Sequence, residues 1–228
     1  LTGEIKKIRV KKEFIKESKI TVIPNGVDLK RFKFSEIDRD FIRDRYNINS
    51  NDIVIGNMAR FTEEKGQAVL LEAFKDLTKS DSLPNKNLKL LFAGGGKLLQ
   101  KVKNGIVGTG LENEIIFTDK FKEEDKVKLL CAIDTFVFPS FAEGFGIALI
   151  EAMSTGLPVI ASDLPVLKDV GGDAAIYFKT GDHTDLARVL KDQLKPDLRR
   201  IPVVKSTDRA KLYSMDNFWY GYRNLYLK

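Results

Sequence analysis

Short apolar runs alternate with longer amphipathic stretches along most of this 228-residue chain, and this alternation constrains the fold more than any other feature. The short runs are rich in Val, Ile and Phe, and several lack the polar alternation of a strand with one wet face. They therefore predict strands that are buried on both faces, as in a parallel sheet covered by helices. We expect strands at 20–24, 53–59, 88–94, 114–119, 135–140, 158–162 and 174–178.

Four of the intervening stretches have the periodicity of amphipathic helices, at 65–80, 123–134, 145–156 and 183–194. Strands that alternate with helices imply right-handed crossovers, which predicts an α/β fold with a doubly wound, Rossmann-like parallel sheet. Such sheets bind ligands beyond the carboxyl ends of their strands. We therefore expect four loops to gather at one edge of the sheet: 60–65, 94–97, 118–122 and 139–146.

The composition excludes several classes of protein. Cys131 is the only cysteine, so an intramolecular disulfide framework and a multi-cysteine zinc site are excluded, and we interpret Cys131 as a small core residue. No apolar run reaches the length of a membrane span. We expect the protein in a reducing compartment, the cytoplasm, either free or at the inner face of the membrane.

The positive charge is concentrated near the N-terminus. Between Glu4 and Lys19 seven basic and three acidic residues give +4, which leaves only +2 of the total +6 for the rest of the chain. A globally basic nucleic-acid-binding surface is therefore not indicated. The basic stretch reads as a helix that could lie on an anionic membrane. The alternative, which we favour, is a solvated helix or one packed on a domain outside this chain.

The segment from Glu143 to Glu151 combines two carboxylates with glycines at a predicted helix start. We expect the helix to begin near Phe145, where the unpaired backbone N–H groups attract an anion such as phosphate, and Gly144 and Gly146 remove side-chain bulk there. A carboxylate beside an anion suits a ligand with hydroxyl groups. Eight residues of helix span roughly 12 Å, the scale of a sugar and a ribose on either side of a diphosphate. Two solvated glutamates are the alternative.

Arg60 and Lys65 follow a predicted buried strand and precede a helix, so they belong to the same sheet edge. Two cations there can neutralise a diphosphate and stabilise it as a leaving group. The alternative is a pair of surface cations in a turn.

Five segments together carry a resemblance to a known family: 22–28 (VIPNGVD), 59–66 (ARFTEEKG), 90–96 (LLFAGGG), 143–153 (EGFGIALIEAM) and 156–163 (GLPVIASD). The chain resembles the C-terminal, donor-binding domain of retaining glycosyltransferases with the GT-B fold (glycosyl transferases group 1), from about residue 20 to its end. The resemblance implies three regions. They are a basic linker helix at 1–19 from an absent N-terminal domain, a nucleotide-sugar-binding domain at 20–205, and a C-terminal helix at 206–228 that packs back.

The resemblance also implies roles for individual residues. Glu143, Arg60 and Lys65 become the candidate catalytic residues, with Glu143 near the donor sugar and the two cations on the diphosphate. The residues implied to bind the donor are Arg60, Lys65, Phe121 beside the nucleobase, Gly144, Phe145, Gly146, Ile147, and Glu151 on the ribose. The family often has Gly at the position where this chain has Asp119.

The implied activity is transfer of a hexose from a GDP- or UDP-linked donor to a glycan or lipid-linked acceptor, without metal or other cofactor, as in polysaccharide or O-antigen biosynthesis. The N-terminal domain would supply most of the acceptor site, so we expect this chain alone to bind the donor weakly and to transfer little. A non-catalytic nucleotide-sugar-binding module and a GT-B epimerase or phosphorylase remain alternatives.

Other motifs are given structural interpretations. Asp38 and Asp40 resemble a metal-binding Asp-x-Asp, but they diverge on a charged helix, and we predict no metal site. Leu99 stands where a dinucleotide fingerprint needs its third glycine, which disfavours a dehydrogenase. A glycosidase would use two carboxylates but gives Arg60 and Lys65 no anion. His183, the only histidine, falls where Asp182 or Thr184 could cap a helix.

Overall fold

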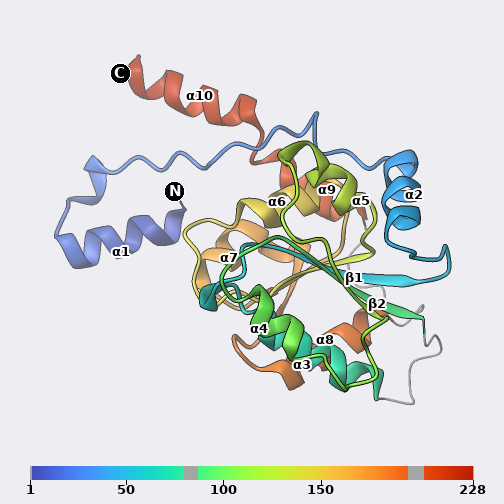
Figure 1. Cartoon of the computed structure of the whole chain (residues 1–228). Helices are drawn as coiled ribbons and strands as arrows, with labels where there is room; N and C mark the ends of the chain where they lie inside the picture. Colours follow the sequence, from blue (N-terminus) through green and yellow to red (C-terminus); the bar gives the residue numbers. More distant parts are fainter. Residues whose placement is uncertain (1, 80–86, 195–202, 228) are drawn as a thin grey trace.

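A parallel sheet forms the centre of the molecule in the computed structural model, which describes residues 2–79, 87–194 and 203–227 (Figure 1). Its six strands lie in the order β3-β2-β1-β4-β5-β6, and all five neighbouring pairs are parallel. The predicted α/β, doubly wound fold is therefore confirmed. The strands are β1 (Ile53–Met58), β2 (Leu88–Ala93), β3 (Ile115–Phe117), β4 (Thr135–Phe138), β5 (Val159–Ser162) and β6 (Ala175–Phe178).

Helices cover both faces of this sheet (Figure 1). On β1, Ile55 packs into one hydrophobic cluster, whereas Val54 and Met58 pack into the other. Both faces are thus dry, which explains the continuous apolar strands. The Ile55 side holds α3 (Gln67–Thr78), α4 (Leu99–Asn104) and α8 (His183–Leu194). The opposite side holds α2 (Glu36–Arg45), α5 (Lys126–Cys131), α6 (Ile147–Ser154), α7 (Pro165–Gly171) and α9 (Val203–Lys211).

The N-terminal part corrects one prediction. Residues 20–24 form no strand, and the nearest pairing is an isolated bridge between Val27 and Ser214. Their apolar side chains are only partly buried, because they lie beside the C-terminal helix rather than a sheet neighbour. The basic stretch forms α1 (Gly3–Glu13), which contains no buried residue and ends at Phe14 in the left-handed conformation, and a 3-10 turn (Glu17–Lys19).

The C-terminal region divides into two helices with different environments. Helix α9 packs against α6, and its Ala210 is buried. Helix α10 (Met215–Tyr226) contains no buried residue, and Trp219 and Tyr226 are largely exposed. The single C-terminal helix expected over residues 206–228 is two helices in the structure. Helix α9 packs on α6, whereas α10 lies against Ile23 and Gly26 of the N-terminal segment. Helices α4 and α7 had no sequence prediction of their own.

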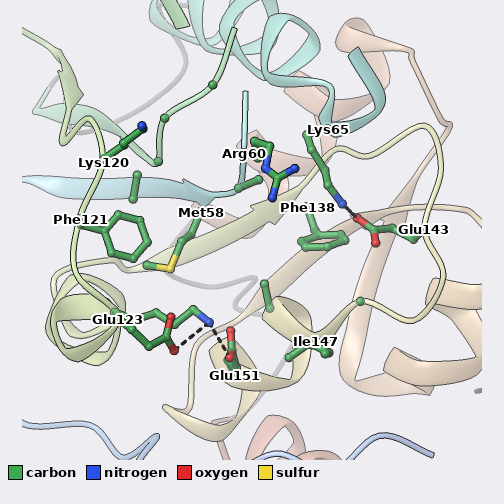
Figure 2. A pocket seen from close by; sticks show the side chains of 18 of the residues that line it. Met58, Arg60, Lys65, Lys120, Phe121, Glu123, Phe138, Glu143, Ile147 and Glu151 are labelled. Atoms are coloured by element: carbon green, nitrogen blue, oxygen red, sulfur yellow. Dashed lines mark hydrogen bonds and ion pairs between the residues drawn. The ribbon is translucent and has the colours of Figure 1, made fainter. Parts of the chain in front are cut away.

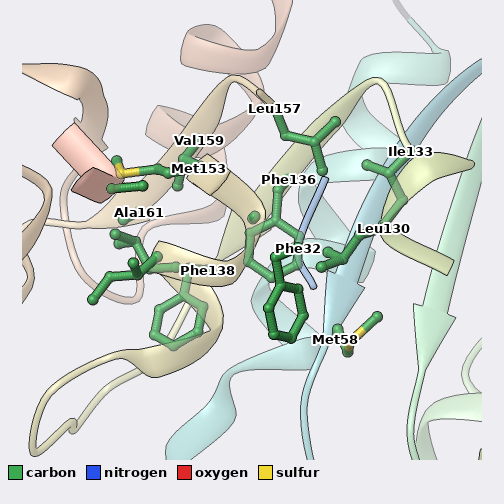
Figure 3. Packing of buried hydrophobic residues seen from close by; sticks show 14 of the residues in the cluster. Phe32, Met58, Leu130, Ile133, Phe136, Phe138, Met153, Leu157, Val159 and Ala161 are labelled. Carbon is green, nitrogen blue, oxygen red and sulfur yellow. The ribbon is translucent and has the colours of Figure 1, made fainter. Parts of the chain in front are cut away.

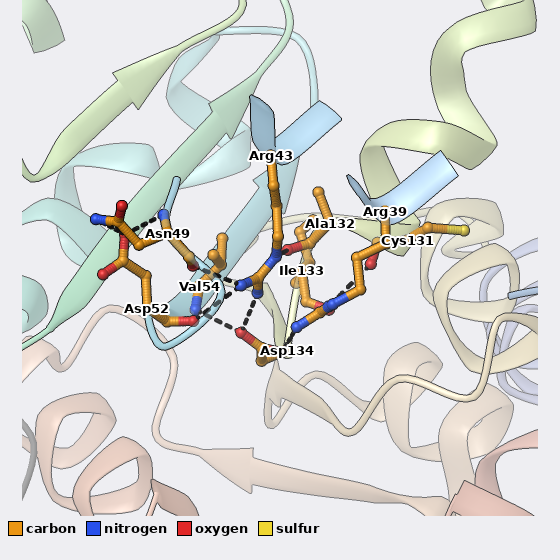
Figure 4. Close-up of polar contacts among 9 residues, drawn as sticks. All are labelled: Arg39, Arg43, Asn49, Asp52, Val54, Cys131, Ala132, Ile133 and Asp134. Carbon is orange, nitrogen blue, oxygen red and sulfur yellow. Dashed lines mark hydrogen bonds and ion pairs between the residues drawn. The ribbon is translucent and has the colours of Figure 1, made fainter. Parts of the chain in front are cut away.

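A buried polar cluster at the amino ends of β1 and β4 fixes α2 to the sheet (Figure 4). Arg43 on α2 is 4% exposed and donates to the carbonyl oxygens of Asn49, Asp52 and Ala132 and to Asp134 Oδ2. Asp134 also binds Arg39 through Oδ1 and the backbone N–H of Val54 through Oδ2. We call Arg39, Arg43 and Asp134 the amino-end cluster.

At the opposite ends of β1 and β4 the strands carry large apolar side chains (Figure 3). Phe136 and Phe138 project from the same face of β4, with ring centroids 6.2 Å apart, and both belong to the buried cluster that contains Met58 and Phe32. Phe138 and Met58 also line the cavity described next. The hydrophobic core therefore continues directly into the floor of that cavity.

Candidate functional site

A cavity of about 970 Å³ opens at the carboxyl ends of the central strands (Figure 2). The residues that follow β1, β2, β3 and β4 all contribute to its wall, as the sequence predicted for loops 60–65, 94–97, 118–122 and 139–146. The sheet order reverses between β1 and β4, because β1 leads outward to β2 and β3 while β4 leads to β5 and β6. Ligands of doubly wound folds bind at such a switch point.

Arg60 and Lys65 both line the cavity, as predicted, on the segment between β1 and α3. Gly66 ends the 3-10 turn Glu63–Lys65 with φ +65°, and a Cβ there would lie 2.0 Å from the carbonyl oxygen of Pro139. This segment is thus pressed against the loop that follows β4. Arg60 is exposed and has no ion pair with any residue of the described part of the chain, so its guanidinium is available to an anion.

Lys65 and Glu143 form an ion pair with each other, which the sequence did not predict (Figure 2). Glu143 Oε1 accepts from Lys65 Nζ and, at 2.9 Å, from Ser140 Oγ. The Glu143 side chain is only 10% exposed, and the Lys65 ammonium lies 5.9 Å from the ring centroid of Phe138. The candidate sugar and diphosphate residues therefore sit at one end of the cavity, where each holds the other in place.

The glycine-flanked helix start lies two residues later than expected, since α6 begins at Ile147 with Gly146 as its N-cap at φ +94°. Phe145, Gly146 and Ile147 line the cavity, as predicted. The Phe145 side chain is 6% exposed and packs edge-on against Tyr213. Gly144 lies in the loop just before this segment, and a Cβ there would meet no described atom within 4 Å, so the role expected of Gly144 stays a prediction.

Glu151 lies one turn into α6, is 5% exposed, and lines the cavity apart from the Lys65–Glu143 pair (Figure 2). Its Oε1 accepts a hydrogen bond from Lys126 Nζ at 2.8 Å. Burial raises the pKa of the Glu151 carboxyl, and the bond to Lys126 opposes that rise. An ionised carboxylate has further acceptor positions, so Glu151 can bind hydroxyl groups that enter the cavity.

Phe121 lines the cavity on the loop after β3, as predicted, and packs partly against the hydrophobic core. Asp119 just before it has φ +55°, the left-handed conformation that glycine adopts without cost. This geometry explains why glycine suits the position. The Asp119 carboxylate is turned toward Lys103, with 2.6 Å between Oδ1 and Nζ.

Several residues that line the cavity had no individual role assigned from the sequence, although loops 94–97 and 118–122 were expected at this edge. Gly94 and Gly96 have φ of +137° and +149°, and a Cβ at either would lie within about 2.5 Å of the backbone of Ala59 or Phe61. These glycines could have been recognised only with the topology in hand, because a lone glycine run is common. Lys126 lies in a charged run, 122–128, that resembles any solvated surface. The other lining residues to which the sequence assigned no individual role are Met58, Ala59, Ala93, Gly95, Lys120, Glu123, Phe138 and Ala148.

The structural interpretations can be compared with the geometry. Cys131 is fully buried in the core, as predicted. Asp38 and Asp40 lie on α2, as predicted, and the described residues contain no group of three or more His, Cys, Asp or Glu side chains placed to hold a metal. Asp182 Oδ1 accepts from the backbone N–H of Asp185 at the start of α8, which confirms its capping role. His183 Nδ1 lies 2.9 Å from Asp76, away from the cavity.

Within the described residues, no helix is both long and apolar enough to cross a lipid bilayer.

A doubly wound domain with cations and carboxylates around one switch-point cavity has the ligand-binding architecture of α/β proteins. A model of the family glycosyl transferases group 1 matches residues 38–204. This chain therefore belongs to the glycosyl transferases group 1 family, and the resemblance found in the sequence is confirmed.

Known relatives agree with this membership. Over 216 residues the chain is 29% identical to the alpha-monoglucosyldiacylglycerol synthase of Streptococcus pneumoniae, which covers 90% of this chain and 46% of that protein. Over 165 residues it is 31% identical to the UDP-Gal:alpha-D-GlcNAc-diphosphoundecaprenol alpha-1,3-galactosyltransferase of Escherichia coli, covering 72% and 42% respectively. The chain thus spans less than half the length of these two relatives.

The fold is also that of solved glycosyltransferase structures. Anabaena Alr3699/HepE, crystallised with UDP and glucose, superposes with a TM-score of 0.78 at 21% identity, covering 92% of this chain and 57% of that one. At this identity the likeness concerns the fold alone.

Proposed function

We propose that this chain is the donor-binding half of a retaining glycosyltransferase and binds a UDP- or GDP-linked hexose. The arrangement of one cavity carries the proposal: Glu143 and Glu151 line it at separate places, and Arg60 and Lys65 line it from the segment between β1 and α3. Hydroxyl groups at both ends and two negative charges between them are the features of a nucleotide-diphosphate sugar. The names of the relatives and the UDP complex of HepE add support for such a donor.

In the proposed reaction the bond between the anomeric carbon and the diphosphate oxygen breaks, and its electrons stay on the diphosphate. The oxygen of an acceptor hydroxyl bonds to the anomeric carbon, and the hydroxyl proton passes to the departing diphosphate. Arg60, Lys65 and the N-terminal end of α6 stabilise that growing charge. Glu143 positions the sugar and Glu151 holds the ribose. These groups supply positive charge without a metal ion, and metal independence is part of the proposal, as is retention of the anomeric configuration.

We further propose that a glycan or lipid-linked acceptor binds mainly to residues outside this chain, since the chain spans less than half of its two relatives. Donor binding without appreciable transfer is then expected of the 228 residues alone. Transfer by the chain alone would contradict this part. Turnover in a longer protein distinguishes the enzyme from a non-catalytic nucleotide-sugar-binding module and from an epimerase or phosphorylase.

The diphosphate assignment is tested by calorimetry with UDP, GDP, ADP and the corresponding nucleosides. The wild-type chain should bind one diphosphate in preference to its nucleoside. Arg60→Ala combined with Lys65→Ala should reduce that preference about 100-fold, because two charge-assisted contacts are lost. Lys75→Ala is the matched control, since Lys75 pairs with Glu72 on the exposed side of α3. A double variant that keeps the preference would refute the assignment.

For the basic N-terminal stretch, whose favoured interpretation from sequence is a solvated helix, we propose as the alternative a peripheral contact with an anionic membrane at its cytoplasmic face. Helix α1 has no buried residue, Phe14 at its end is 90% exposed, and the surrounding charge is positive. A basic helix with exposed apolar groups binds anionic lipid through both features. The chain should therefore sediment with vesicles that contain phosphatidylglycerol and not with phosphatidylcholine vesicles. Equal sedimentation with both, or with neither, would contradict the contact.

A further inference from the structure

Lys126, the first residue of α5, occupies a place in the cavity that its sequence context did not reveal. Its side chain is 19% exposed, lines the cavity, and ends with Nζ 2.8 Å from Oε1 of the buried Glu151. The two residues belong to different helices, so this contact exists only because α5 and α6 are neighbours at the sheet edge. The ammonium group is thus aimed at the carboxylate that we place on the ribose.

Few other charges act on Glu151. Glu123, in the 3-10 turn before α5, lies 3.4 Å from Lys126 and carries the same charge as Glu151. Arg31 acts from further away and is paired with Glu123 at 3.2 Å. On α9, which packs against α6, Arg209 is engaged by backbone oxygens of Asp169 and Val170. Lys126 is therefore the cation that directly compensates the buried carboxylate.

Without that ammonium, the Glu151 carboxylate would still be buried, and the like charge of Glu123 would be the strongest charge left acting on it. Both conditions favour protonation. A protonated carboxyl group donates one hydrogen bond and loses acceptor strength, so it binds a pair of hydroxyl groups less well than a carboxylate does. The state of Glu151 near neutral pH consequently depends on Lys126.

We infer that Lys126 is a positioning residue, whose ammonium keeps Glu151 ionised and fixes Oε1 so that the carboxylate can accept the ribose hydroxyl groups of the donor nucleotide. The assignment of the ribose rests on the proposed function; the coupling between Lys126 and Glu151 does not.

The binding test compares Lys126→Met with the wild type across pH 6.0 to 8.5, using whichever of UDP and GDP the wild type binds more tightly. Lys126→Met should bind about tenfold more weakly at pH 6.0 and recover as Glu151 ionises at higher pH. Lys126→Arg should restore most of the affinity. Lys128→Met should match the wild type, because Lys128 on the same helix pairs with Asp125.

Two further comparisons separate positioning from direct contact. The 2′,3′-dideoxy form of the same nucleotide lacks the hydroxyl groups, so Lys126→Met should not change its affinity. In a Glu151→Gln background, Lys126→Met should have no added effect, since interacting residues are non-additive. A uniform loss at all pH values, with either nucleotide and in both backgrounds, would overturn the inference and make Lys126 a direct ligand of the nucleotide.

A measurement without ligand tests the coupling alone. The Glu151 side-chain carboxyl can be titrated by ¹³C NMR, with its resonance assigned by its loss in Glu151→Gln. The pKa of Glu151 should be higher in Lys126→Met than in the wild type and unchanged in Lys128→Met. An unchanged pKa in Lys126→Met would overturn the inference even if nucleotides bind. A raised pKa with no nucleotide binding by the wild type would instead refute the proposed function.

Discussion

The amino-end cluster and the cavity lie at opposite ends of the same strands, and both pair basic side chains with carboxylates. In the amino-end cluster, both oxygens of Asp134 and most donors of Arg43 are engaged by side chains and backbone. In the cavity, Lys126 holds one oxygen of Glu151, and Arg60 has no ion pair with a described residue. Charged side chains whose hydrogen-bonding positions are nearly all occupied by the protein indicate a structural role. Charged side chains beside a cavity that keep unoccupied hydrogen-bonding positions indicate a ligand site.

Of the substitutions that distinguish the amino-end cluster from the cavity, Arg43→Met is expected to change the free energy of unfolding most. It leaves three buried carbonyl oxygens short of a donor and Asp134 with one cation fewer. The free energy of unfolding should fall by about 3 kcal/mol, because breaking a buried ion pair leaves charge uncompensated. Urea denaturation measures the change. The folded variant should keep the nucleotide affinity of the wild type, since the cavity lies at the other end of the strands.

Arg45→Met on the same helix is the control, because Arg45 is exposed and only stacks on Tyr46. Arg45→Met should lower the free energy of unfolding by less than about 1 kcal/mol. Equal losses for the two variants would mean that burial and hydrogen bonding do not distinguish the amino-end cluster from the surface.

Glu151→Gln in the cavity is expected to change the free energy of unfolding less than Arg43→Met does, and to raise it rather than lower it. Burial raises the pKa of Glu151 in the folded chain above its ordinary value of 4.5. The folded state therefore resists ionisation, and stability is lost as pH rises from 4.5 through the folded-state pKa. A neutral glutamine avoids this loss, so the variant should gain stability relative to the wild type as the pH rises above 4.5.

The same substitution should weaken nucleotide diphosphate binding, because glutamine offers one weaker acceptor. Parallel urea titrations at pH 5 and pH 8, with calorimetry at pH 8, measure both consequences. If Glu151→Gln were destabilised at pH 8 and still bound nucleotide normally, Glu151 would belong with the structural carboxylates, and the contrast between the two ends would fail.

The candidate site was largely predictable residue by residue, though its contacts were not. Arg60, Lys65, Phe121, Glu143 and Glu151 line one cavity, as expected, because parallel strands joined by helices bring every following loop to the same edge. The start of α6 was placed two residues too early, since a helix start can be located from sequence only to within a few residues. The prediction of a strand at 20–24 was wrong, because an apolar run does not specify which element of the fold will pack against it.

Helix α2 shows the same limit. Ile37, Phe41 and Ile42 are the apolar residues of this helix, yet Ile37 and Phe41 are 83% and 53% exposed, and Arg43 is buried beside Ile42. An arginine becomes a core residue only where carbonyl groups and a carboxylate from other segments surround its guanidinium, and α2 alone does not encode those partners.

The sequence by itself determined the α/β class, the burial of the strands on both faces, and the loops that share an edge, because periodicity and chain order are local properties. Only the tertiary structure decided which charges meet. The pairs Lys65 with Glu143 and Lys126 with Glu151 each join two separate elements. A side chain of a few ångströms reaches a partner only after the strand order has placed the two elements together, and a linear pattern does not contain that distance.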